Sequence, residues 1–282
     1  MGGAGLPDGS AVLREWTSAA GAWRKWRREF AMQSRAATRL LLEAALVEPG
    51  MRILDLASGS GEPAVSLAVA AGAEARVVAT DIVPAMLLGA REHAAERGRG
   101  NVAFAAANSE VLPFPDGTFD RLTCRFGAMF FPGIEQAMVE ARRVLRPNGR
   151  AIFLAWGEAR HSTFFTTTTG VLLRHAPSAQ QTPDLAHRFA APGSLSAALG
   201  HGAFRQITET FHSICWPWPG TPEGFWDYSV EVRRTFRKIF ESLGPAERQQ
   251  AKQESLAEMQ RFYDGRQVNF DGQIVIAAGV RA

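Results

Sequence analysis

The chain has 282 residues, of which 46% are hydrophobic and 21% charged, and its formal net charge is +3 at pH 7. This composition suffices for a full core, and two cysteines exclude a disulfide framework. The mild positive charge does not demand a polyanionic partner. The basic residues at 24–28 are predicted to form the solvated face of an amphipathic helix, not a nucleic-acid contact.

No apolar segment of signal-peptide type begins the chain, and no run of about 18 apolar residues occurs in it. We therefore expect a cytoplasmic protein without stable membrane insertion. It is expected to act on a small molecule, not on nucleic acid, as a monomer or homodimer.

The predicted elements begin with two helices within residues 11–47, which end at Glu48-Pro49-Gly50. Strands and helices then alternate, with strands at 51–57, 76–80, 101–107, 119–126 and 150–156. After Gly157 the pattern becomes mostly helical and irregular. A strand-like segment lies at 203–211, two helices are predicted within 222–263, and a last strand follows.

This alternation indicates βαβ units and therefore an α/β fold with a doubly wound, mostly parallel sheet. The predicted parts are an N-terminal helical cap, a ligand-binding core, a helical substrate or lid insertion that includes one core strand, and a final core strand. Their expected bounds are 1–47, 48–157, 158–270 and 271–282.

A glycine-rich turn follows the first strand, in the run ILDLASGSGEPAVSLA. Gly59, Gly61 and Ala64 match the dinucleotide fingerprint, and Asp81 follows at the spacing of a ribose-binding acid. In such sheets the ligand binds at the carboxyl ends of the strands, beside this turn.

Asp55 in the same run is not explained by a dinucleotide. A carboxylate at this turn repels pyrophosphate and attracts a cation. S-adenosylmethionine (SAM) has no phosphate and carries an ammonium and a sulfonium, so the charge pattern favours SAM.

Several motifs, in the correct order, resemble those of class I SAM-dependent methyltransferases. ILDLASGSGEP resembles their first motif, TDIVPAML the second, ANSEVLPFPDGTFD the adenine-contact segment, and RRVLRPNGRAIFLAW the helix and strand that follow. The resemblance covers about residues 40–157. Within the class, the chain is similar to the ubiquinone/menaquinone-biosynthesis C-methyltransferase (methyltransferase type 11) group. It implies a Rossmann-like core, SAM as cofactor and S-adenosylhomocysteine as product.

The resemblance also implies which residues bind the cofactor. Asp81 is expected to hold the ribose, and Asn108 replaces an Asp that often faces the adenine amino group. Ala57 departs from the usual glycine but is still small. Arg125 and Phe126 are expected to line the mouth where the methyl group is transferred. The full implied set is Asp55, Ala57, Ser58, Gly59, Gly61, Asp81, Ile82, Met86, Asn108, Ser109, Glu110, Arg125 and Phe126.

Aromatic residues in the cap and the insertion favour an apolar or aromatic acceptor with a carbon, oxygen or nitrogen nucleophile. The candidates for substrate contact are Trp16, Trp23, Phe130, Trp216 and Trp226. No metal site is expected, and the segment CRFG at 124–127 lacks the Asn/Asp-Pro-Pro-aromatic tetrad of nucleobase amino-methyltransferases. No catalytic base is named, because each histidine of the variable part is more typical of a surface or structural position: His161, His175, His187, His201 and His212.

Two alternative hypotheses remain. An NAD(P)-dependent oxidoreductase shares the strand, turn, helix and Asp81, but leaves Asp55 and the segment ANSEVLPF unexplained. A non-catalytic relative that keeps SAM as a structural or sensing ligand differs from the enzyme in the lid, not in the cofactor site.

Overall fold

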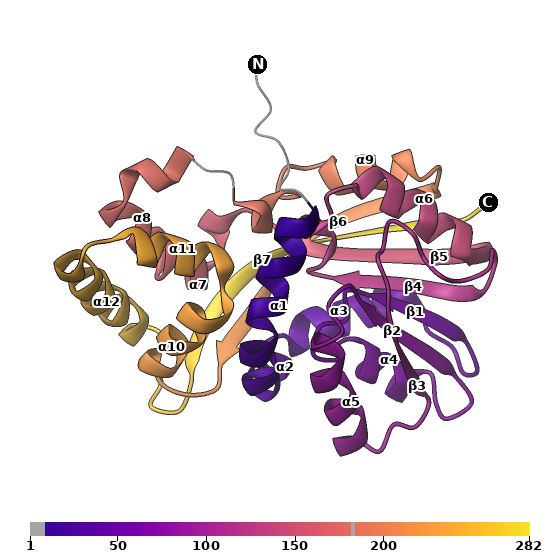
Figure 1. The fold of residues 1–282 in the computed structure, drawn as a ribbon, viewed down its shortest axis with the longest axis horizontal. Coiled ribbons are helices and arrows are strands. Elements are labelled where there is room, and N and C mark those ends of the chain that lie inside the picture. Colours follow the sequence, from indigo (N-terminus) through magenta and orange to yellow (C-terminus); the bar gives the residue numbers. More distant parts are fainter. Residues whose placement is uncertain (1–8, 182–183) are drawn as a thin grey trace.

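The computed structural model describes residues 9–181 and 184–282. Its centre is a seven-stranded sheet in the order β3-β2-β1-β4-β5-β7-β6 (Figure 1). The prediction of a doubly wound, mostly parallel sheet is confirmed. The parallel strands are β1 (Arg52–Leu56), β2 (Arg76–Asp81), β3 (Val102–Ala106), β4 (Phe119–Arg125) and β5 (Leu145–Trp156). β7 (Val268–Val280) runs antiparallel to both β5 and β6 (Arg205–Trp218).

Helices cover both faces of this sheet (Figure 1). In the core they are α4 (Ala64–Ala70), α5 (Met86–Glu96) and α6 (Ile134–Val144), with the short turn η1 (Ala128–Phe130) after β4. The face of α6 predicted to be apolar is the one that is buried, through Ala137, Met138, Ala141 and Val144. Among the described helices, none combines the length and hydropathy that a membrane span requires.

The N-terminal cap contains three helices where two are predicted: α1 (Gly9–Lys25), α2 (Arg27–Gln33) and α3 (Arg35–Ala45). Single residues, Trp26 and Ser34, separate them with ψ angles of 13° and 7°, which interrupt the helices without turning the chain far. Leu41 and Ala45 of α3 are fully buried, and α3 packs on β4 and β5. Residues 1–8 of the predicted cap lie outside the described residues.

The basic cluster at 24–28 is largely a solvated face, as predicted, because the side chains of Arg24, Lys25 and Arg28 are more than half exposed. Its side chains pair with acidic residues of α5 and of the insertion. The pairs are Arg24 with Glu92, Lys25 with Glu231 at 2.7 Å, and Arg27 and Arg28 with Glu96. Each exposed pair contributes little stability, but together they orient α1 and α2 against the core.

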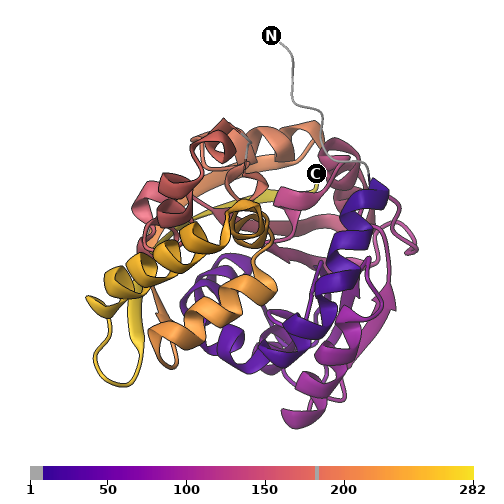
Figure 2. The ribbon, with the colours of Figure 1, turned by 60° about the vertical axis from the view of Figure 1, so that its left-hand side comes forward.

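The insertion consists of two helical segments, one before and one after β6 in the chain, and α8 of the first packs on α11 and α12 of the second (Figure 2). The first contains η2 (Ala159–His161), α7 (Thr163–Thr166), α8 (Thr169–His175), η3 (Pro177–Gln181), η4 (Leu185–His187) and α9 (Ser194–His201). The second contains α10 (Pro222–Val232), α11 (Arg234–Ser242) and α12 (Pro245–Gln260), where two helices are predicted. Extended backbone at Arg233 ends α10, and extended backbone at Leu243 ends α11. β6 runs seven residues past its predicted end, and β7 begins at Val268, before the predicted boundary.

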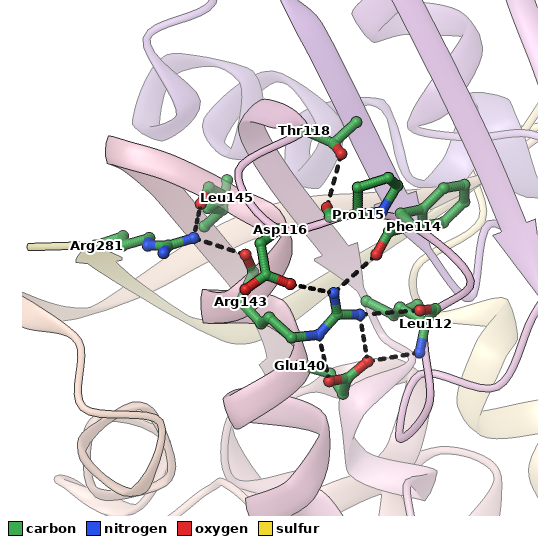
Figure 3. A network of polar contacts seen from close by, with 9 residues as sticks. All are labelled: Leu112, Phe114, Pro115, Asp116, Thr118, Glu140, Arg143, Leu145 and Arg281. Carbon is green, nitrogen blue, oxygen red and sulfur yellow. Dashed lines mark hydrogen bonds and ion pairs between the residues drawn. The ribbon is translucent and has the colours of Figure 1, made fainter.

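Arg143 of α6 fixes the segment that links β3 to β4 (Figure 3). Its guanidinium donates to the carbonyls of Leu112 and Phe114 at 2.9 and 2.8 Å, and to Asp116 at 2.7 Å. Glu140 accepts from Arg143 at 2.7 Å and from the Leu112 N–H at 2.7 Å. These charged hydrogen bonds anchor the chain directly after residues 108–110, which form part of the site.

Candidate active site

A cavity of about 450 Å³ lies at the carboxyl ends of β1, β2 and β4, and we call it the turn cavity. The glycine turn, the ends of β2 and β3, and residues 125–127 form its floor and sides. Helix α1 covers it through Gly9, Ser10, Val12, Leu13, Trp16 and Trp23. Segments far apart in sequence therefore meet where a doubly wound sheet binds its ligand.

A second cavity of about 130 Å³ adjoins the first, and we call it the aromatic chamber. The residues that line both cavities are aromatic: Trp16, Trp23, Phe30, Phe126 and Phe130. Further aromatic walls come from β5, β6 and the insertion: Trp156, Phe164, Phe165, Trp216, Phe225, Tyr228 and Phe236. The two cavities thus meet across a shared aromatic boundary.

Phe126 occupies this boundary in a strained conformation. Its φ of 60° is rare for a bulky side chain and costs about 1–3 kcal/mol. The ring is held by stacking on Trp156, with centroids 4.2 Å apart, and by an edge contact with Trp216. Packing from β5 and β6 therefore fixes the orientation of Phe126 at the mouth.

Gly127 explains how the turn tolerates alanine at position 57. A Cβ on Gly127 would lie 2.5 Å from the Cβ of Ala57 and 2.9 Å from the Sγ of Cys124. Only glycine leaves room for the extra methyl group of Ala57, so the two positions compensate each other.

Most of the predicted site residues line these cavities. Those at the turn cavity are Ala57, Ser58, Gly59, Asp81, Ile82, Met86, Asn108, Ser109, Glu110, Arg125 and Phe126. Trp16, Trp23 and Phe130 line both cavities, and Trp216 lines the aromatic chamber alone. Three of the predicted residues, Asp55, Gly61 and Trp226, line neither cavity.

Asp55 lies fully buried beneath the turn instead of facing the turn cavity. Its carboxylate accepts hydrogen bonds of 2.6 Å from the hydroxyls of Ser58 and Thr123. Burial raises the pKa of Asp55 to about 7, although these hydrogen bonds partly offset the effect. Asp55 therefore links the turn to β4, and its carboxylate faces the hydroxyls of Ser58 and Thr123.

Gly61 and Trp226 are also packing positions. A Cβ on Gly61 would lie 3.0 Å from the Cα of Ala90, so glycine allows α5 to approach the turn closely. Trp226 packs edge-on against Phe236 and Phe240, with centroids 5.1 and 5.4 Å away, inside the insertion.

The raised pKa of Asp55 predicts how Asp55→Asn changes stability with pH. Between the ordinary pKa of 3.8 and about 7, the folded parent keeps a proton that the unfolded chain has lost. The parent therefore loses stability as pH rises through this window, by on the order of 4 kcal/mol, and the variant lacks this loss. Denaturant unfolding of both proteins at pH 4 and pH 8 measures the difference. A stability difference that is the same at both pH values would contradict the prediction.

Glu62 is a site residue that the sequence reasoning missed. Glu62 lines the turn cavity, and its carboxylate oxygen Oε2 is buried without a partner at full hydrogen-bond geometry in the described part of the chain, although the Ser66 hydroxyl also acts on the carboxylate. The other oxygen lies 3.1 Å from Nε2 of His93. Burial raises the pKa of Glu62, but the bond to His93 and the charge of Arg125 more than offset this, so the pKa stays below its ordinary value. A carboxylate therefore lies at the wall of the turn cavity, next to the charge of Arg125.

Asp81 holds the turn from the opposite side. Its carboxylate accepts from the N–H groups of Gly59 at 3.0 Å and Val83 at 2.9 Å. Burial raises its pKa, and the two N–H donors counteract that shift. Gly59 has a φ of 52° and open space where a Cβ would lie, so the backbone at this point is accessible to a ligand.

The side chains of Asn108 and Glu110 form hydrogen bonds with the backbone around the cavity. Oδ1 of Asn108 accepts from the N–H of Glu110 at 2.9 Å, and Oε1 of Glu110 accepts from the N–H of Gly133 at 2.8 Å. The Asn108 oxygen keeps a second lone pair, so it can still accept one bond from a ligand.

Arg125 connects the cap to the mouth. Its Nη1 donates to the hydroxyls of Ser34 and Thr38 at 2.6 Å each, and Nη2 donates to the carbonyl of Glu62 at 3.1 Å. Burial lowers the pKa of the guanidinium. Arg125 therefore fixes the junction of α2 and α3 against the turn.

The histidines considered as candidate bases line neither cavity in the described part of the chain. His187 lies nearest in sequence to chamber residues; its Nδ1 is 2.7 Å from the carbonyl of Gly157 and its ring packs on Phe165. The structure thus assigns no base among them.

The strand order with an antiparallel β7 between β5 and β6, together with the glycine turn after β1 and the acid that ends β2, matches the Rossmann-like fold of the SAM-dependent methyltransferase class. The chain belongs to the ubiE/COQ5 methyltransferase family, whose pattern matches residues 19–168. It is therefore an enzyme of SAM-dependent methyl transfer to a small molecule, and the oxidoreductase hypothesis is wrong.

Individual relatives agree with this placement. The ubiquinone/menaquinone biosynthesis C-methyltransferase UbiE of Methylobacterium nodulans is 34% identical over 177 residues, which cover 58% of this chain and 70% of that protein. UbiE of Teredinibacter turnerae is 37% identical, over 44% of this chain and half of its own length. The solved structure of the [4+2]-cyclase SpnF has 17% identity and a TM-score of 0.59, covering 98% of this chain and 97% of SpnF, which shows the shared fold.

Proposed function

We propose that this enzyme transfers a methyl group from SAM, bound in the turn cavity, to an apolar or aromatic acceptor bound in the aromatic chamber. The observation that carries the proposal is the pair of adjoining cavities with a common aromatic boundary. SAM supplies a methyl group made electrophilic by a positively charged sulfur.

The residues of the turn cavity fit SAM. The Glu62 carboxylate at the cavity wall supplies negative charge for an ammonium group, and Asp81 is placed to accept from ribose hydroxyls. Ile82 and Met86 offer apolar surface to a purine ring. The Glu62 carboxylate also disfavours pyrophosphate, so it takes the discriminating role first expected of Asp55.

At the boundary, the residues position the reactants and exclude water. Trp16 and Trp23 cover the meeting point from α1, and Phe126 and Arg125 shape the mouth. Holding the acceptor atom about 3 Å from the methyl group supplies much of the rate enhancement. A dry, closed site also preserves that geometry.

An aromatic acceptor agrees with the names of the relatives, which are C-methyltransferases of quinone biosynthesis. We include carbon, oxygen and nitrogen nucleophiles in the proposal. A cytoplasmic location and a monomeric or homodimeric state are part of it, on the basis of the sequence.

Calorimetry with SAM, S-adenosylhomocysteine, NAD and NADP tests the cofactor assignment. We expect micromolar binding of the first two and none of the dinucleotides. Tighter binding of either dinucleotide would overturn the proposal. A screen of aromatic acceptors for SAM-dependent mass gain then tests the acceptor class, and products formed only from aliphatic acceptors would argue against it.

A further inference from the structure

Arg233 is a charged side chain in the wall of the aromatic chamber. It lies at the extended break between α10 and α11. Its guanidinium carbon is 5.4, 4.9 and 5.5 Å from the ring centroids of Phe164, Phe165 and Phe236. The aromatic chamber therefore contains a cation that aromatic faces surround.

The hydrogen-bond partners of Arg233 are neutral. Nη1 donates to the hydroxyls of Thr168 at 2.7 Å and Ser229 at 3.5 Å, and Nη2 donates to Thr169 at 2.9 Å. No carboxylate of the described residues lies within ion-pair distance. Burial lowers the pKa of Arg233 to about 10, so the side chain stays protonated at neutral pH. The charge of Asp184 acts on Arg233 without forming an ion pair with it, so the buried cation remains costly and a bound anion would relieve that cost.

Two other charged residues border the chamber, and both are engaged elsewhere. Oδ1 of Asp184 accepts from the Ala186 N–H at 3.1 Å and from the Thr235 hydroxyl at 2.9 Å. Arg234 forms an ion pair with Glu15 of α1 at 2.5 Å. Among the described residues that line the chamber, Arg233 is therefore the cation left without a carboxylate.

Building on the proposed function, we propose that Arg233 binds the carboxylate of an aromatic acid that serves as the methyl acceptor. Arginine has five N–H donors, and the three bonds above leave the Nε–H and one Nη2–H free. Nε and Nη2 lie on the same edge of the guanidinium, and this edge can pair with both oxygens of a carboxylate. The aromatic walls hold the ring, and Arg233 selects the acid over its neutral analogues.

The test compares 2-naphthoate with its neutral analogue 2-naphthamide, by fluorescence titration of the protein with and without S-adenosylhomocysteine. The parent is expected to bind the carboxylate at least tenfold more tightly than the amide. Arg233→Gln should remove this preference while amide binding stays within about twofold, and Arg233→Lys should keep part of it. Arg248→Gln is the matched control, because Arg248 also lies over an aromatic ring in the insertion but lines neither cavity.

Equal affinity of the parent for the two compounds would overturn the proposal, and so would a carboxylate preference that survives in Arg233→Gln. The parent comparison requires no variant, so a folding defect in Arg233→Gln does not remove the test. The titration without S-adenosylhomocysteine separates this proposal from the proposed function. If the protein does not bind the cofactor, the proposed function is contradicted. If the parent binds the carboxylate and the amide equally, only the role of Arg233 is contradicted.

Discussion

Replacing Trp16 and Trp23 together by alanine is expected to reduce turnover at least about a hundredfold, because misplacement by about 1 Å has an effect of that size. Both rings line the two cavities, and Trp16 packs edge-on against Phe130 with centroids 5.1 Å apart. Their removal opens the boundary to water and leaves the acceptor without one wall. Steady-state kinetics with an acceptor found in the aromatic screen measures the effect.

Cofactor affinity should fall much less than turnover in this double variant, since the polar contacts of the turn cavity come from the sheet. Trp226→Phe is the control, because Trp226 is a tryptophan of the insertion that lines neither cavity. Near-parent turnover in the double variant would show that the cap only packs on the core. A parallel loss of cofactor affinity and turnover would show that α1 acts on cofactor binding alone.

Asp81→Ala is expected to weaken SAM binding by about tenfold to a hundredfold, because a hydrogen bond to a charged acceptor contributes roughly 1.5–3 kcal/mol. The substitution removes the proposed acceptor for the ribose hydroxyls and also frees the N–H groups of Gly59 and Val83. Asp81→Asn should weaken binding less, since its oxygen can still accept. Calorimetric titration with SAM and S-adenosylhomocysteine measures both variants.

The two consequences of Asp81→Ala can be separated by measuring stability. If the loss of affinity came only from a loosened turn, the melting temperature of the free protein would fall in proportion. Asp120→Asn is a useful control, because the Asp120 carboxylate accepts from the backbone N–H of Arg52 at 2.6 Å but lines neither cavity. Unchanged SAM binding in Asp81→Ala would exclude the proposed ribose contact.

Local patterns in the sequence determined the core of this protein. The apolar residues of strands and amphipathic helices recur at short, regular spacings in the sequence. Glycines mark turns where the backbone takes a positive φ, as at Gly59. The succession of strands along the chain up to β5, the turn and the acid at the end of β2 follow from such signals. They also sufficed to indicate SAM, because each motif lies within one strand–turn–helix unit.

Tertiary structure alone decided which way individual side chains face. Asp55 and Glu62 are acids of the same turn region, yet hydroxyls from β4 and from the turn bury Asp55, whereas Glu62 lines the cavity. The same holds for the aromatic residues of the insertion, since Trp216 reaches the chamber and Trp226 does not. Arg233 becomes a chamber residue only because α8, α10 and α11 converge on it. The burial and orientation of these side chains depend on contacts between segments that are distant in the sequence. The local spacing of apolar residues does not determine such contacts.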